Sequence, residues 1–130
     1  MSGLTLVIIV FWTVCWVATV AIETTVLALL LSPRHGWRVR LFAGMWLSAC
    51  TLPVVWLALP DALPMTFSRA AVVAVAEVFA PLTECGIFWW AFIRPRPPDR
   101  RATIRDLVAI VAANLASFAT GEAVWLLLSW

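Results

Sequence analysis

The chain has 130 residues, of which 64% are hydrophobic and 12% are charged, and its formal net charge is +2. Soluble domains are roughly half apolar and about a quarter charged, so this composition excludes an ordinary soluble domain. A helix that crosses a bilayer needs about 20 mostly apolar residues. Four such segments fill most of the chain, at residues 4–31, 41–60, 70–93 and 107–130. The sequence therefore predicts one all-α membrane domain, residues 1–130, built as a bundle of four transmembrane helices.

The first predicted helix carries a single charged residue, Glu23, and no basic residue precedes it. Its apolar run is longer than the roughly 7–15 residues that form the core of a signal peptide. We therefore expect this segment to be a membrane helix and not a cleaved signal.

The loops that follow the first and third helices hold eight of the nine basic residues, all of them arginines: Arg34, Arg38, Arg40, Arg94, Arg96, Arg100, Arg101 and Arg105. Arginine-rich loops remain on the cytoplasmic side of a membrane. Both termini and the connection around Asp61 are then expected outside the cytoplasm, with the protein in a bacterial inner membrane. We interpret the arginines as orientation signals and lipid-headgroup contacts, and we expect no nucleic-acid partner.

The second and fourth helices each have one face of small and polar residues. In the helix over 41–60 this face carries Gly44, Ser48 and Thr51. In the helix over 107–130 it carries Asn114, Ser117 and Gly121, with Glu122 at its edge. Small residues allow membrane helices to approach closely, so we expect these two faces to lie inside the bundle.

The third helix carries Glu77 and Glu84, which are two helical turns apart and therefore share a face. Pro81 lies between them, and because proline has no N–H it leaves the carbonyl of Glu77 without its helical donor. Pro53 in the second helix does the same for Ala49. A freed carbonyl at membrane depth needs a partner or a hydrated cavity.

The two halves of the chain resemble each other. Residues 41–59 align with residues 110–128 without gaps, and seven pairs are identical: Ala43, Ser48, Thr51, Val55, Trp56, Leu57 and Leu59 fall on Ala112, Ser117, Thr120, Val124, Trp125, Leu126 and Leu128. The preceding helices correspond loosely, with Glu23 on Glu84. The pattern predicts two pseudo-repeated helical hairpins related by an axis along the membrane normal.

The polar residues fall at two depths. Glu23 lies 11 residues before Arg34, Glu84 lies 10 before Arg94, and Asn114 lies 9 after Arg105. Because an α-helix rises about 1.5 Å per residue, these three residues lie at nearly the same depth and form an inner layer near mid-membrane. A second pair, Glu77 and Glu122, lies roughly 10–12 Å further out.

Intramembrane carboxylates are costly, at roughly 2.5–3.5 kcal/mol each on insertion scales, and by default they indicate a functional site. We expect a central binding site formed by Glu23, Glu84 and Asn114, an outer relay formed by Glu77 and Glu122, and support from the hydroxyl groups of Ser48, Thr51 and Ser117. The predicted function is the binding or transport of a proton, a metal cation or a small cationic solute.

Other interpretations remain open. Protonated glutamates can hold helices together as a hydrogen-bonded core. The chain can then be a non-catalytic subunit or assembly factor of a larger membrane complex, or form a homo-oligomer. A third interpretation is an intramembrane enzyme that acts on a lipid-soluble substrate.

The sequence also excludes several chemistries. His35 is the single histidine, which excludes bis-histidine haem ligation and an HExxH zinc site. There is no phosphate loop, GxSxG elbow or dinucleotide fingerprint. The sequence identifies no catalytic residue, so a non-enzymatic role is favoured, while the metal and any cofactor stay undetermined.

Short motifs in all four helices resemble a group of small four-helix bacterial inner-membrane proteins without an assigned function. The likeness consists of Glu in the first helix (Glu23), T-x-P-x-x-W in the second (Thr51, Pro53, Trp56), two Glu seven residues apart in the third (Glu77, Glu84), and N-x-x-S-F-x-x-G in the fourth (Asn114, Ser117, Phe118, Gly121). This chain departs from the group by lacking Asn in the second helix and by adding Glu122. The resemblance implies the four-helix fold and brings no activity with it.

Overall fold

The computed structural model describes residues 3–63 and 66–128. The helices are α1 (Gly3–Leu30), α2 (Trp37–Pro53), the π-helix η1 (Val54–Ala58), α3 (Leu59–Ala62), α4 (Arg69–Phe88), the π-helix η2 (Trp89–Ile93) and α5 (Arg100–Leu128). Since α2, η1 and α3 are continuous, and α4 runs directly into η2, the chain forms four helical rods. No strand occurs in the described residues, and the predicted all-α fold is confirmed.

All four rods are long and apolar enough to cross a membrane, with mean hydropathies of 1.6 to 2.4 over their most apolar windows. Large apolar side chains cover their outer surfaces; Leu29, Phe42, Leu82 and Leu127 are 56–76% exposed. Polar residues such as Ser48 lie inside instead. An apolar surface around a polar interior suits lipid as the surrounding solvent. The predicted transmembrane character of the four helices is therefore confirmed by their length and apolar composition.

Two helices begin earlier than predicted. The second begins at Trp37 instead of residue 41, and the fourth at Arg100 instead of residue 107. The prediction followed the apolar run, which marks membrane depth, whereas a helix begins at its cap. The Asp99 carboxylate accepts a hydrogen bond from the backbone N–H of Ala102 at 3.0 Å. The last two residues of the fourth predicted span, 129–130, lie outside the described residues.

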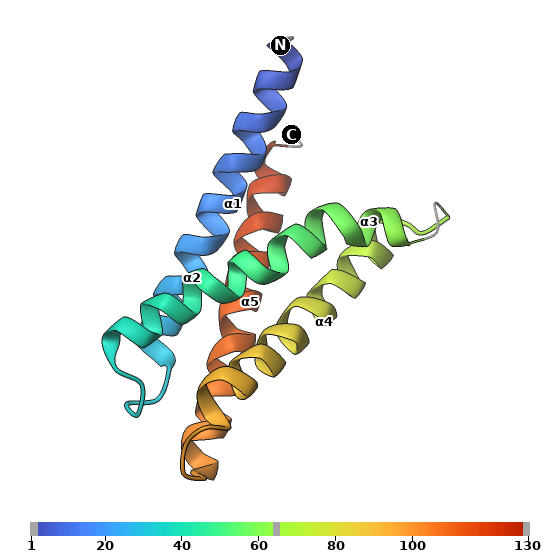
Figure 1. Cartoon of the computed structure of the whole chain (residues 1–130). Coiled ribbons are helices and arrows are strands. Elements are labelled where there is room, and N and C mark those ends of the chain that lie inside the picture. The colour runs from blue at the N-terminus through green and yellow to red at the C-terminus, as the bar shows by residue number, and fades with distance from the viewer. Residues whose placement is uncertain (1–2, 64–65, 129–130) are drawn as a thin grey trace.

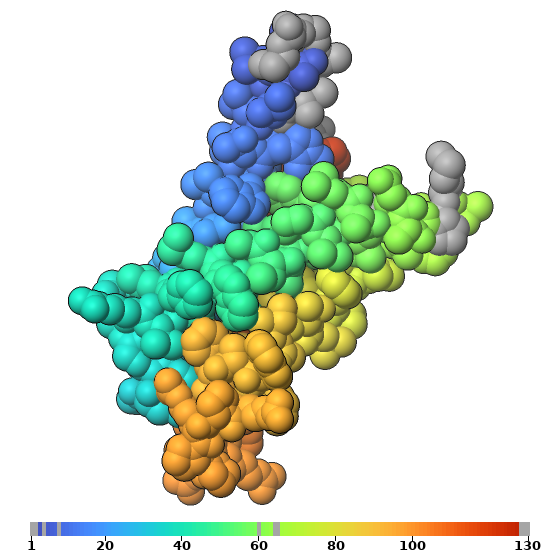
Figure 2. Space-filling model, in the orientation of Figure 1, coloured from blue at the N-terminus to red at the C-terminus, as the bar shows by residue number. Residues whose placement is uncertain are grey.

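The rods pack in a ring in which α1 and α4 each contact both α2 and α5. Both arginine-rich loops lie at one end of the molecule, and the first turns of α1 and the last turns of α5 lie on the opposite side (Figure 1). Toward that opposite side, α3 and the start of α4 lean away from α1 and α5 (Figure 1). In the space-filling view, α1 and the arm that carries α3 project as separate lobes (Figure 2).

Both prolines that interrupt predicted helices lie within continuous rods. The helix passes through Pro81 as an α-helix, whereas after Pro53 it widens into the π-helix η1. Because proline removes one backbone donor, a local change of helical pitch is an ordinary way to accommodate it.

A small apolar core holds the rods together near the arginine-rich loops. Its buried members are Leu27, Leu31, Ala43, Leu47, Phe88, Ile93, Ala109, Ile110 and Ala113. They come from α1, the adjoining loop and all three other rods. The polar residues of the inner layer lie further along the rods, on the side that faces the diverging ends.

The helices α1 and α2 approach each other closely at Gly44. A Cβ atom at this position would lie 2.5 Å from the Cα atom of Thr24, a distance that backbone atoms cannot accommodate without a shift. The small face predicted for the second helix therefore has a direct packing reason.

Replacing Gly44 by alanine should lower the free energy of unfolding by about 1–3 kcal/mol, because the two backbones must separate. Gly86→Ala in α4 is the matched control, since no atom lies within 4 Å of a Cβ placed there. Unfolding in mixed micelles, followed by circular dichroism, measures both. Equal stability of the two variants would show that the α1–α2 contact is not tight.

Candidate functional site

Glu23 of α1 is 4% exposed and lies between α2 and α5. Its carboxylate accepts one hydrogen bond from Ser48 Oγ of α2 and another, at 2.7 Å, from Ser117 Oγ of α5. These two serines are equivalent in the internal repeat. One carboxylate therefore ties three helices together.

Glu84 of α4 is 1% exposed and makes the same kind of bridge from the opposite side of the ring. Its two carboxylate oxygens accept hydrogen bonds from Thr51 Oγ1 of α2 and from Asn114 Nδ2 of α5, each at 2.7 Å. The partners lie one helical turn from those of Glu23. The structure thus brings together the residues of the predicted inner layer, because Glu23 and Glu84 bond to neighbouring turns of the same two helices.

The hydrogen atoms around Glu84 can be counted. Thr51 Oγ1 also lies 3.1 Å from the carbonyl oxygen of Leu47, and Asn114 Nδ2 lies 3.1 Å from that of Ile110. The amide has two hydrogens for its two acceptors, but the hydroxyl has one hydrogen for two. A proton on Glu84 supplies the missing hydrogen and satisfies all four contacts. The same shortage occurs at Glu23, because the Ser48 and Ser117 hydroxyls also lie 2.9 Å from the carbonyl oxygens of Gly44 and Asn114.

A cavity of about 180 Å³ adjoins this network. Side chains from α1, α2, η1, α4 and α5 line it, and its polar lining residues are Thr19, Glu23, Thr51, Glu77, Asn114, Ser117 and Glu122. The structure therefore places both predicted layers around one space, with one exception. Glu84 does not line the cavity, because it lies behind its partners Thr51 and Asn114.

Glu77 is the least satisfied of these carboxylates. It is half-buried, and it has no hydrogen-bond or ion-pair partner among the described residues. Glu23 and Glu122 line the same cavity. A half-buried carboxylate without a partner is costly unless a proton, water or a ligand compensates it.

Glu122 differs because it has a basic partner. Arg69, the first residue of α4, donates a hydrogen bond from Nη2 to Glu122 Oε1 at 2.7 Å. The same guanidinium lies 5.0 Å from the centre of the Trp125 ring, which is a cation–π distance. The Arg69 side chain is 56% exposed and that of Glu122 33%.

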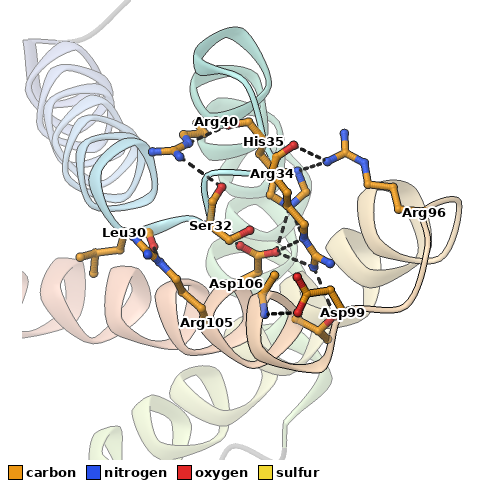
Figure 3. Close-up of polar contacts among 11 residues, drawn as sticks. Leu30, Ser32, Arg34, His35, Arg40, Arg96, Asp99, Arg105 and Asp106 are labelled. Carbon is orange, nitrogen blue, oxygen red and sulfur yellow. Dashed lines mark hydrogen bonds and ion pairs between the residues drawn. The ribbon is translucent and has the colours of Figure 1, made fainter.

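A second polar cluster, which the sequence did not indicate, lies at the other end of the bundle (Figure 3). Asp106 of α5 is fully buried and accepts hydrogen bonds from the Ser32 backbone N–H at 2.7 Å and from Arg34 Nη2 at 2.6 Å. Arg105 donates to the carbonyl of Leu30 at 2.8 Å. These contacts fasten the α1–α2 loop to the beginning of α5.

His35 is also buried in this cluster, at the edge of the Phe88 ring. Arg96 Nη1 lies 2.9 Å from His35 Nδ1 (Figure 3). Because a guanidinium can only donate, Nδ1 must accept, and the proton of the neutral ring lies on Nε2. That nitrogen lies 2.9 Å from Asp106 Oδ2 and donates to it. The histidine therefore joins the two arginine-rich loops.

One sequence signal could have indicated this cluster. Asp106 is an acidic residue directly beside Arg105, in a segment where topology alone calls for basic residues. Arg34 lies in an arginine-rich loop, where an orientation signal is the ordinary interpretation. Its ion pair with Asp106 was therefore not expected.

Within residues 3–63 and 66–128, no group of three or more His, Cys, Asp or Glu side chains is arranged to hold a metal ion. Comparison with protein-family models, with curated protein sequences and with solved structures finds no match for the chain.

Replacing Asp106 by asparagine should destabilise the protein by about 2–4 kcal/mol, because a buried charge partner of Arg34 is removed and an amide group faces its donors. Asp99→Asn is the matched control, since asparagine caps a helix as well as aspartate does. Thermal unfolding in detergent measures both variants. If Asp106→Asn unfolds at the same temperature as Asp99→Asn, the cluster does not hold the loops.

Proposed function

We propose that the protein binds a small cation in the cavity lined by Glu23, Glu77 and Glu122, in exchange for a proton. The observation that carries this proposal is the half-buried carboxylate of Glu77, which has no partner among the described residues and lies on the wall of a cavity. Glu23 and Glu122 add negative charge to the same space.

The charge balance of the cavity supports exchange. Three carboxylates share it, and within the described part of the chain Arg69 is the basic residue that pairs with one of them, Glu122. Carboxylates in a poorly hydrated space cannot all be ionised without positive charge nearby. The cavity therefore holds protons when it is empty of cations, and a cation that enters replaces a proton.

Glu84 supports a second role for the inner layer. Its hydrogen bonds to Thr51 and Asn114 place a proton-accepting group directly behind the cavity wall. We assign Glu84 as the group that holds the exchangeable proton and passes it to or from the cavity. The sequence had predicted instead that Glu84 contacts the cation directly.

Apolar packing and the Asp106 cluster close the end near the arginine-rich loops, and in this proposal the cation enters from the opposite side. Alternating access would require the core around Phe88 and Leu47 to separate. In this proposal the loops are cytoplasmic, the cavity mouth faces outward across a bacterial inner membrane, and the chain belongs with the small four-helix proteins that its motifs resemble.

The alternative is a subunit of a larger membrane complex. The divergence of α3 and α4 from α1 and α5 favours it, because a partner helix can fill the space between two diverging arms (Figure 1). Glu23 and Glu84 would then serve only to hold the helices together.

Cation-induced proton release separates these two functions. Purified protein in weakly buffered detergent is mixed with sodium, magnesium or methylammonium chloride while the pH is recorded. We expect release approaching one proton per protein for at least one cation, and none from Glu77→Gln or Glu23→Gln. A protonated glutamate and a glutamine have similar shapes, so both variants should remain folded.

Asp61→Asn is the matched control, because Asp61 is an exposed acid in α3 that does not line the cavity. It should release protons as the parent does. Identical traces from the parent, Glu77→Gln and Glu23→Gln would rule out cation exchange and leave the complex-subunit function as the better account.

A further inference from the structure

We infer that the cation is an amphipathic organic one, with a flat delocalised charge such as a guanidinium next to an apolar group. This inference rests on the proposed function and specifies its ligand. Three features of the cavity support it: an adjoining apolar cavity, a guanidinium of the chain itself near the carboxylates, and the placement of the acceptors.

The apolar cavity is a partly open groove of about 310 Å³, and its lining includes Phe11, Ile22, Val124 and Trp125. Phe11, Val124 and Trp125 are about half exposed, so the groove opens onto the apolar outer surface. It shares Thr19, Trp56, Ser117 and Gly121 with the carboxylate cavity. The two spaces therefore adjoin along a common wall. A ligand with its charge near Glu77 can place an apolar group against Trp56 and beyond.

Arg69 lines neither cavity, but its side chain contacts one lining residue of each, Glu122 and Trp125. Its guanidinium is bonded to Glu122 and lies over Trp125, which lines the apolar cavity. A planar guanidinium can bond a carboxylate and stack on an aromatic ring at the same time, whereas a compact ammonium does so less well. Since both partners are partly exposed, a ligand can displace Arg69 at small cost.

The acceptors are also placed for an organic cation. Glu23, Glu77 and Glu122 belong to α1, α4 and α5, and much of the wall between them is apolar, including Leu52, Val55 and Ala76. A divalent ion such as calcium needs six or more oxygen ligands in close contact. A guanidinium instead presents five N–H donors over a wide fork and can bond separated carboxylates.

The test compares three probes on the purified full-length chain by isothermal titration calorimetry in detergent. Guanidinium carries the charge alone, phenylguanidinium adds an apolar ring, and phenylurea keeps the ring but is neutral. We expect phenylguanidinium to bind about tenfold more tightly than guanidinium, because the ring leaves water for the apolar cavity. Phenylurea should not bind. Glu77→Gln in the same detergent corrects for partition into micelles and should bind neither cation.

Two further variants test the assignment of the walls. Trp125→Leu should weaken the binding of both cations and reduce the preference for phenylguanidinium to about twofold or less, because the aromatic surface that contacts the guanidinium and the phenyl ring is lost. Arg69→Gln should tighten the binding of both cations severalfold, because the competing guanidinium is gone. If Arg69 only stabilises the fold, this variant will instead bind more weakly or with unchanged affinity, which would overturn the inference.

The outcomes also separate this inference from the proposed function. Equal affinities for guanidinium and phenylguanidinium, both lost in Glu77→Gln, would overturn the amphipathic ligand and leave cation exchange intact. Phenylurea binding as tightly as phenylguanidinium would overturn it too, because the apolar cavity would then be a site for neutral groups such as lipid chains. If no probe binds and no cation releases protons, both proposals are wrong.

Discussion

The structure depends on one constraint: a polar side chain at membrane depth must find its partners inside the protein. Glu23 and Glu84 meet it in the same way, each by accepting two hydrogen bonds, one from α2 and one from α5. These bridges join α1 and α4, which lie on opposite sides of the ring, through the same two helices. The apolar core and the close contact at Gly44 then bring the helices near enough for the bridges to form.

The satisfied and unsatisfied carboxylates have different roles in this account. Glu23 and Glu84 are held by neutral donors, so they can gain or lose a proton without losing their neighbours. Glu77 has no such partner among the described residues, and it lies in the cavity where Glu122 is already paired with Arg69. The polar interior joins the helices, and in the proposed function it also supplies the negative charge that attracts a cation. At the other end, Asp106 and His35 fasten the loops and keep that end closed.

The sequence predicted the four helices, because 20-residue apolar runs allow few other structures in a chain of this composition. Counting residues from the arginines also grouped Glu23, Glu84 and Asn114 at one depth, and the structure places them in one network. The depth of a residue does not specify the direction in which its side chain points around the helix axis. Depth therefore could not show that Glu77 lines the cavity whereas Glu84 lies behind its wall. The helix starts at Trp37 and Arg100 were missed because hydropathy does not report caps. The Asp106 cluster was missed because an acidic residue beside Arg105 does not by itself identify a partner in a distant loop.

The central claim is that a cation entering the cavity removes a proton from a carboxyl group there. Infrared difference spectroscopy of the protein in lipid, with and without guanidinium, measures this at the group itself. The account predicts that guanidinium removes a carboxylic-acid stretching band and adds a carboxylate band in the parent, and that Glu77→Gln lacks this change while Asp61→Asn keeps it. An unchanged spectrum in the parent, or the same difference spectrum in Glu77→Gln, would contradict it.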